Sequence, residues 1–173
     1  MSTPGVIVHP GSGLLAKAAA ARIVTRLIDA QTARGSASIV LTGGSIGIAV
    51  LAELARAPAR DAINWPLLDV WWGDERFLPT GDPDRNETQA REALLDRVGV
   101  APERVHPMPA SDGPDGDAPE RGAERYAAAL ADATRSRSLR TAVPRSSPIL
   151  IFTAPTPSSS TQRRSWASDW RGS

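Results

Sequence analysis

Residues 38–57 carry the feature that most limits how this chain folds. A short run rich in β-branched residues, 38–42, leads directly into Gly43-Gly44-Ser45, and an apolar segment that ends before Pro58 follows it. This order is typical of a strand, a tight turn and a helix. Strands that alternate with helices over short connections predict a mostly parallel sheet with helices on both faces.

The same order recurs along the chain and defines the predicted elements. Helices are predicted at 14–33, 46–57, 87–98 and 120–133, and strands at 5–9, 38–42, 67–72 and 105–109. The strand 67–72 is almost continuously apolar, as in a strand covered on both faces, and its Trp71-Trp72 pair is interpreted as core. Prolines restrict 105–109 to the edge of the sheet. Asn86 is predicted to cap the helix 87–98.

Residues 1–133 and 134–173 differ in composition, and we predict one incomplete α/β domain followed by an irregular tail. The first part holds 13 Lys and Arg against 18 Asp and Glu, whereas the second holds 7 against 1. Ten serines and four prolines lie in the last 40 residues, where only 148–152 has the pattern of a strand. This Ser/Pro/Arg-rich composition predicts disorder. A basic arm can bind nucleic acid, although we expect no nucleic-acid partner.

Missing residue types and patterns exclude several classes of function. The chain has no cysteine, which excludes a disulfide framework, a thiolate nucleophile and a cysteine-based zinc site. It has neither an apolar run of membrane-spanning length nor the pattern of a signal peptide. We therefore expect a cytoplasmic location and no membrane partner. We also expect a monomer without a metal or a cofactor.

Three short motifs are expected at one rim of the sheet, because ligands of open α/β sheets bind beyond the carboxyl ends of the strands. They are His9, Gly43-Gly44-Ser45 and Asp74-Glu75-Arg76. The two glycines would let backbone N–H groups and the Ser45 hydroxyl hold a phosphate, and Arg76 would add a cation. Alone, each motif is also consistent with a simple connector or a solvated loop with a local ion pair. Their combination favours a phosphate site.

Longer motifs around these residues resemble the 6-phosphogluconolactonase family. They are Leu41-Thr42-Gly43-Gly44-Ser45, Trp71-Trp72-Gly73-Asp74-Glu75-Arg76-Phe77-Leu78-Pro79, and Arg85-Asn86-Glu87 with Ala90 and Leu94-Leu95. The resemblance covers about residues 5–133. It implies the Rossmann-like α/β fold shared with glucosamine-6-phosphate isomerases and deaminases. It also implies hydrolysis of 6-phosphogluconolactone, in the pentose phosphate pathway, without a metal.

The resemblance further implies roles for individual residues. Gly43, Gly44 and Ser45 would bind the 6-phosphate, Asp74 and Arg76 would be catalytic, and Arg85 and Asn86 would bind the sugar-phosphate substrate from one side. The deaminase branch tends to carry Asp-Glu-Tyr where this chain has Asp74-Glu75-Arg76, which favours the lactonase.

The catalytic base of the family has no counterpart in the sequence. Lactone hydrolysis needs a base to activate water, and the family supplies a histidine in a Gly-Pro-Asp-Gly-His type motif after the next strand. His9 and His106 are the only histidines, and both lie upstream of that position, although either could be recruited. Three functions stay open: an impaired lactonase, a noncatalytic sugar-phosphate-binding fragment, and an enzyme similar to the glucosamine-6-phosphate deaminases.

A frameshift would account for both the missing motif and the change in composition. If GC-rich codons encode residues 153–157, a shifted frame reads Gly-Pro-Asp-Ala, which is close to the start of the missing motif. We therefore expect the shift between residues 134 and 147. Sequencing of the encoding DNA tests this hypothesis.

Overall fold

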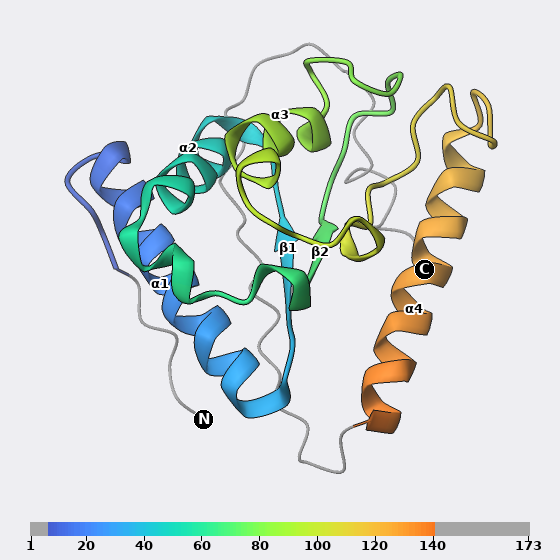
Figure 1. The fold of residues 1–173 in the computed structure, drawn as a ribbon. Coiled ribbons are helices and arrows are strands. Elements are labelled where there is room, and N and C mark those ends of the chain that lie inside the picture. The colour runs from blue at the N-terminus through green and yellow to red at the C-terminus, as the bar shows by residue number, and fades with distance from the viewer. Residues whose placement is uncertain (1–6, 141–173) are drawn as a thin grey trace.

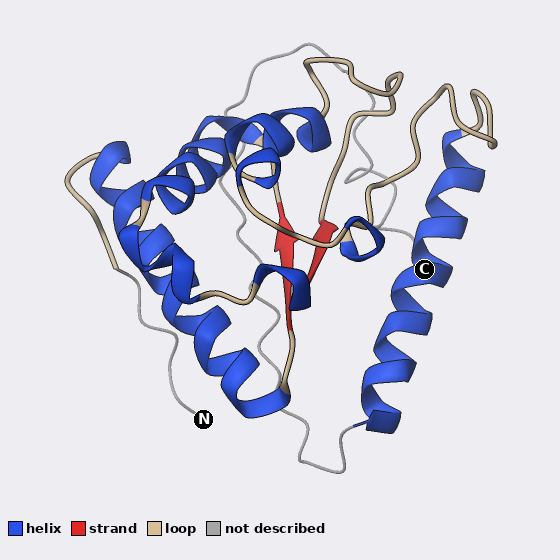
Figure 2. Ribbon diagram, in the orientation of Figure 1, coloured by secondary structure: helices blue, strands red, loops and turns tan. Residues whose placement is uncertain are grey.

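The computed structural model describes residues 7–140, which fold around two parallel strands. The main elements are α1 (Ser12–Arg34), β1 (Ala37–Leu41), α2 (Gly44–Arg56), β2 (Leu68–Trp72), α3 (Asn86–Ala93) and α4 (Pro119–Arg140), with short 3-10 helices at Pro58–Ala62, Trp65–Leu67, Leu95–Arg97 and Pro102–Arg104. Figure 1 shows α1 and α2 on one side of the strands, α4 on the other side, and α3 beyond the carboxyl ends of the strands. In Figure 2 the helices surround the two strands. The predicted α/β fold with a parallel sheet is confirmed.

The register of the two strands places their carboxyl ends, and the motifs that follow them, side by side. Ala37 lies opposite Leu68, and Leu41 lies opposite Trp72. The pairing extends one residue further, because the Gly73 N–H donates to the Leu41 carbonyl at 2.9 Å. The chain therefore leaves both strands at the same rim of the sheet.

Helix α1 buries an apolar stripe against α2 and the sheet. Its buried residues recur at spacings of three and four, as the sequence predicts for one helical face: Ala16, Ala19, Ala20, Ile23, Val24 and Leu27. Gly35 ends the helix in the left-handed conformation, with φ of 76°, and its N–H donates to the Gln31 carbonyl. A glycine in this conformation is a common way for a helix to end.

Tyr126 connects α4 to the sheet. Its hydroxyl accepts a hydrogen bond from the Trp72 N–H at 2.8 Å and donates to the Trp72 carbonyl at 3.1 Å. Burial raises the pKa of Tyr126 to about 12. Trp71 and Trp72 are 4% and 1% exposed, so both belong to the core as predicted. Trp71 also stacks on the His106 ring, with ring centroids 4.0 Å apart.

Two predicted strands differ from the structure. Residues 7–9 form no strand, and Ile7 and Val8 are 61% and 86% exposed. A strand needs a neighbour for its backbone N–H and C=O groups, and none of residues 7–140 pairs with this segment. The segment 105–109 is reduced to one bridge between Val70 and Val105. Its prolines lack the N–H groups that a longer ladder would need.

The helices differ from the prediction mainly at their ends. Helix α3 ends at Ala93, before the predicted residue 98, and a 3-10 turn follows it. Helix α4 continues past residue 133 to Arg140, because nothing in this stretch breaks a helix. The compositional boundary thus falls inside α4, and the division into a domain and a tail stays a prediction. The predicted strand 148–152 lies outside the described residues. Within residues 7–140, no helix has the length and apolar character of a membrane span.

Candidate active site

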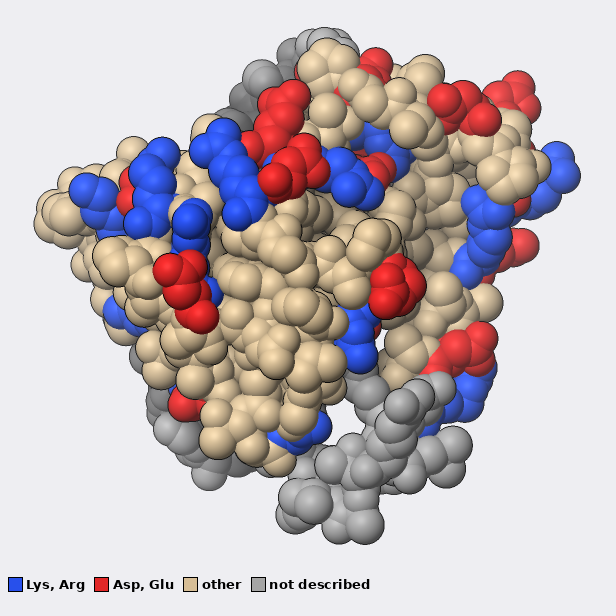
Figure 3. Space-filling model, in the orientation of Figure 1, with Lys and Arg blue, Asp and Glu red and all other residues tan. Residues whose placement is uncertain are grey.

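A shallow, open pocket of about 570 Å³ lies where α2, α3 and the loop after β2 meet. It is lined by Gly44, Ser45, Ile48, Arg76, Gln89, Glu92 and Ala93. Figure 1 shows α2 and α3 next to each other beyond the carboxyl ends of the strands. In Figure 3, acidic and basic side chains mix along this edge of the visible face. The pocket brings together three of the predicted site residues, Gly44, Ser45 and Arg76.

The double-glycine turn forms the first wall of the pocket. Gly43 is the N-cap of α2, and Gly44 begins the helix with φ of 80°, which favours glycine. A Cβ atom on Gly43 would lie 1.8 Å from Asn86 Oδ1, so the close approach of α3 requires glycine here. The first N–H groups of α2 have no partner within the helix, and the helix dipole makes this end favourable for an anion. The Ser45 side chain beside them is exposed.

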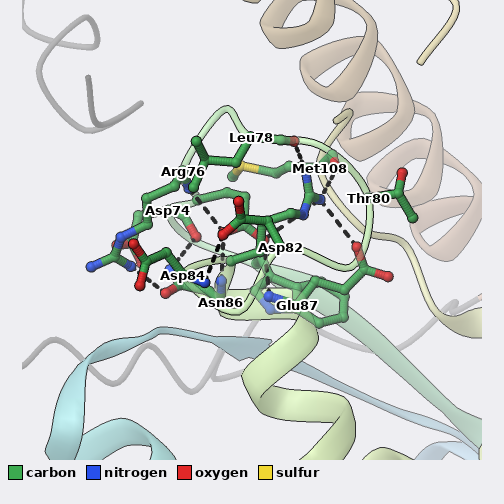
Figure 4. Close-up of polar contacts among 12 residues, drawn as sticks. Asp74, Arg76, Leu78, Thr80, Asp82, Asp84, Asn86, Glu87 and Met108 are labelled. Atoms are coloured by element: carbon green, nitrogen blue, oxygen red, sulfur yellow. Dashed lines mark hydrogen bonds and ion pairs between the residues drawn. The ribbon is translucent and has the colours of Figure 1, made fainter. Parts of the chain in front are cut away.

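The Arg76 guanidinium forms the second wall and is tied to its neighbours. Arg76 Nη1 donates to Asn86 Oδ1. The Asn86 amide nitrogen donates to the Asp74 carbonyl at 2.9 Å, and the Asp74 carboxylate accepts from the Thr42 hydroxyl at 2.9 Å. Figure 4 shows Asp74, Arg76 and Asn86 close together in this network. The prediction that Asn86 caps α3 is wrong, because its side chain makes no cap bond and instead bonds to Arg76 and to the Asp74 carbonyl in the loop after β2.

Glu75 supplies the cap that Asn86 does not. Its carboxylate accepts from the N–H of Asn86 at 2.6 Å, of Glu87 at 2.9 Å and of Arg76 at 2.9 Å. A negative charge at this position also suits the N-terminal end of the α3 dipole. The residue is 1% exposed. Burial raises the pKa of Glu75 above its ordinary value and outweighs the N–H donors and the Arg85 charge, which lower it.

Arg85 lies inside the protein rather than in the pocket lining. It is 1% exposed, and its guanidinium donates to the carbonyls of Leu78 at 3.1 Å and Met108 at 2.9 Å. The same group pairs with Glu87 at 3.0 Å and lies 3.7 Å from Glu75. Asn86, also 1% exposed, is absent from the lining too. Direct substrate binding by these two residues stays a prediction.

Neither histidine lines the pocket. His9 precedes α1 and is half-buried, and the expected convergence of His9 with the other two motifs is not observed. His106 stacks on Trp71, and its Nε2 lies 3.5 Å from Asp69 Oδ1. Residues 7–140 contain no cluster of histidine and carboxylate side chains that could hold a metal ion.

The sequence reasoning missed several pocket residues on α3 and α2. Gln89, Glu92 and Ala93 share the pocket-facing side of α3, and Ile48 lies one turn into α2. Glu92 and Ala93 follow Gln89 by three and four residues, so the sequence could have shown that all three lie on one face of the helix. The Glu92 carboxylate adds a negative charge, so an anion is expected nearer to Arg76 and the start of α2.

This geometry has counterparts among known proteins. The family profile described as glucosamine-6-phosphate isomerases/6-phosphogluconolactonase matches residues 11–150. The chain belongs to this family. Its match continues beyond the predicted limit at residue 133, into residues that the structure does not describe.

Curated relatives in the 6-phosphogluconolactonase family are similar over the same part of the chain. The 6-phosphogluconolactonase of Streptomyces coelicolor is 60% identical over 132 residues, which are 76% of this chain and 51% of the relative. That of Mycobacterium tuberculosis is 45% identical over 124 residues, 72% of this chain and 49% of the relative. The chain thus spans about half the length of the curated relatives it matches.

Solved structures show the same fold. The 6-phosphogluconolactonase of Trypanosoma brucei superimposes with a TM-score of 0.63 at 28% identity, covering 78% of this chain and 51% of that one. A monomeric glucosamine-6-phosphate deaminase gives a TM-score of 0.64 at 15% identity, covering 76% and 52%. At this identity, the similarity to the deaminase shows a shared fold and nothing more.

Proposed function

We propose that this chain provides the phosphate-binding part of a 6-phosphogluconolactonase site. The reaction would be hydrolysis of 6-phospho-D-glucono-1,5-lactone to 6-phospho-D-gluconate, the activity in the names of its curated relatives. The observation that carries the proposal is the pocket itself, which joins the N-terminus of α2 to the Arg76 guanidinium. Backbone N–H groups and a guanidinium are the donors that a phosphate dianion accepts best.

Lactone hydrolysis needs two kinds of group, an anchor for the 6-phosphate and a base for the attacking water. Water attacks the lactone carbonyl, the ring oxygen leaves with a proton, and a base removes the proton from the attacking water. Gly43, Gly44 and Ser45 would anchor the 6-phosphate, while Asp74 and Arg76 would complete the site. The anchor is supported by the pocket, whereas neither histidine lines it. We therefore propose that the lactonase activity of this polypeptide is impaired.

A noncatalytic sugar-phosphate binder is the second candidate, and the position of the histidines favours it. An anchor without a base would bind the product as well as the substrate. In either case we propose a cytoplasmic monomer that needs no cofactor or nucleic acid. The deaminase alternative has the weaker support, because the likeness to a deaminase concerns the fold alone.

Two measurements on the full chain separate these candidates. Calorimetric titration with 6-phospho-D-gluconate should show saturable binding that Arg76→Ala weakens, whereas Arg26→Ala, an exposed arginine of α1, leaves it unchanged. Absence of binding would refute the anchor. Lactone hydrolysis faster than spontaneous opening would support the enzyme, and binding without acceleration would support the noncatalytic function.

A further inference from the structure

The Asn86 carboxamide is committed to protein groups on both of its polar atoms. The side chain is 1% exposed, its Oδ1 accepts from Arg76, and its Nδ2 donates to the Asp74 carbonyl at 2.9 Å. A carboxamide is one of the few side chains that offers an acceptor and a donor side by side. In this structure both are directed at the loop after β2 rather than at the pocket.

The position of Asn86 is itself fixed from two sides. Its backbone N–H donates to Glu75 Oε1 at 2.6 Å, which holds the first residue of α3 against the loop. On the other side the side chain lies against Gly43, where even a Cβ atom would overlap it. Asn86 therefore has little room to adopt another rotamer.

The bond to Asn86 restricts the Arg76 side chain before any ligand binds. Arginine has a long side chain that loses considerable rotamer entropy when it is immobilised by a ligand. A guanidinium already held at the pocket by Asn86 pays less of that cost on binding, which strengthens binding without a new contact. A guanidinium carries five N–H donors, and the bond to Asn86 uses one of them.

We infer that Asn86 is a positioning residue, which holds the Arg76 guanidinium in place at the pocket and does not itself touch the ligand. The inference rests on the proposed function, because it takes Arg76 as the partner of the phosphate. It departs from a direct role of Asn86 in substrate binding, and the two roles differ in how substitutions at residues 76 and 86 combine.

A double-mutant cycle on the full chain separates them. With 6-phospho-D-gluconate as the probe, Asn86→Ala should weaken binding about tenfold, the effect of losing one hydrogen bond to a charged group. In an Arg76→Ala background the same substitution should cause no further loss. An equal loss in both backgrounds would overturn the inference.

The matched control is Gln31, whose side-chain amide also uses both polar atoms. It donates to the Asn64 carbonyl at 2.7 Å and accepts from the Asn64 N–H at 3.0 Å, at the end of α1 that precedes β1. Gln31→Ala should leave the affinity unchanged. A loss equal to that of Asn86→Ala would mean that affinity follows general stability, and would overturn the inference.

A second measurement needs no ligand, so it separates failure of the inference from failure of the proposed function. Nuclear magnetic resonance of the Arg76 guanidinium, assigned by its loss in Arg76→Lys, should show separate Nη signals in the unsubstituted chain, because the bond to Asn86 slows rotation. Asn86→Asp retains an acceptor oxygen and should keep them separate, and Asn86→Ala should merge them. Merged signals in the unsubstituted chain would overturn the inference whether or not the variants fold. Separate signals without any binding of the probe would support the inference and refute the anchor.

Discussion

Gly43→Ala is the substitution for which the structure predicts the clearest loss of stability. Its new Cβ atom would lie 1.8 Å from Asn86 Oδ1 and 2.3 Å from Asn86 Cγ, far inside contact distance. The backbone at Gly43 has φ of −83°, which alanine adopts readily, so packing alone sets the cost. Asn86 would have to leave its position and break its bonds to Arg76 and to the Asp74 carbonyl.

The expected loss follows from those two hydrogen bonds. Removal of a bond to a charged group costs about 2 kcal/mol and of a neutral bond about 1 kcal/mol, so Gly43→Ala should lower the free energy of unfolding by about 3 kcal/mol. Gly44→Ala is the adjacent control. Nothing lies within 4 Å of a Cβ at Gly44, and its φ of +80° makes backbone strain the only cost, about 1 kcal/mol.

Urea unfolding of the two variants, followed by tryptophan fluorescence, measures the difference. The reasoning would be refuted if Gly43→Ala were no less stable than Gly44→Ala. A double variant supplies the mechanism. Asn86→Ala removes the atoms that the new methyl group meets, so adding Gly43→Ala to it should cost far less than 3 kcal/mol, and full additivity would contradict the overlap.

Further predictions concern the core and the helices. Tyr126 is the only tyrosine, and its pKa is raised to about 12, so its phenolate absorbance should stay absent at pH 10; the stability that depends on its neutral form is complete below pH 10 and falls as the pH approaches 12. Arg85→Met leaves the buried Glu75 without its cation and should cost about 3–5 kcal/mol at neutral pH. That cost should shrink in urea titrations at acidic pH, where Glu75, whose pKa is already raised by burial, takes up a proton; an equal cost at both pH values would contradict this role. Gly13→Ala, in α1 with open space around its Cβ, should raise the free energy of unfolding by about 0.5 kcal/mol, which a slightly higher thermal midpoint would report.

The parts of the fold that depend on neighbours along the chain could be predicted. The strand 38–42, the turn at Gly43-Gly44 and the following helix each have a local cause, which is β-branching, backbone freedom and helical spacing respectively. The glycine stop at Gly35 is equally local. The segment 5–9 has the same local pattern as a strand, but a strand also needs a partner, and sequence reasoning cannot show whether one is near.

The site was predictable at the level of its loops and less so at the level of its contacts. The carboxyl ends of parallel strands place Ser45 and Arg76 at one rim, and the structure confirms that they share a pocket. The bonds of Glu75 to the start of α3 join residues 11 and 12 positions apart, across a loop whose path the sequence does not define. For the same reason Asn86 was interpreted as an ordinary cap.

Because Glu75 caps α3, the loop between Glu75 and the start of the helix should tolerate added residues. Because the first turn of the helix is anchored across the loop, its starting point does not depend on the number of residues in between. Gly81, exposed and with φ of 78°, is a suitable point for added residues, since doubling a flexible loop costs only about 0.6 kcal/mol. A short peptide spliced in at Gly81 should therefore leave α3 in register.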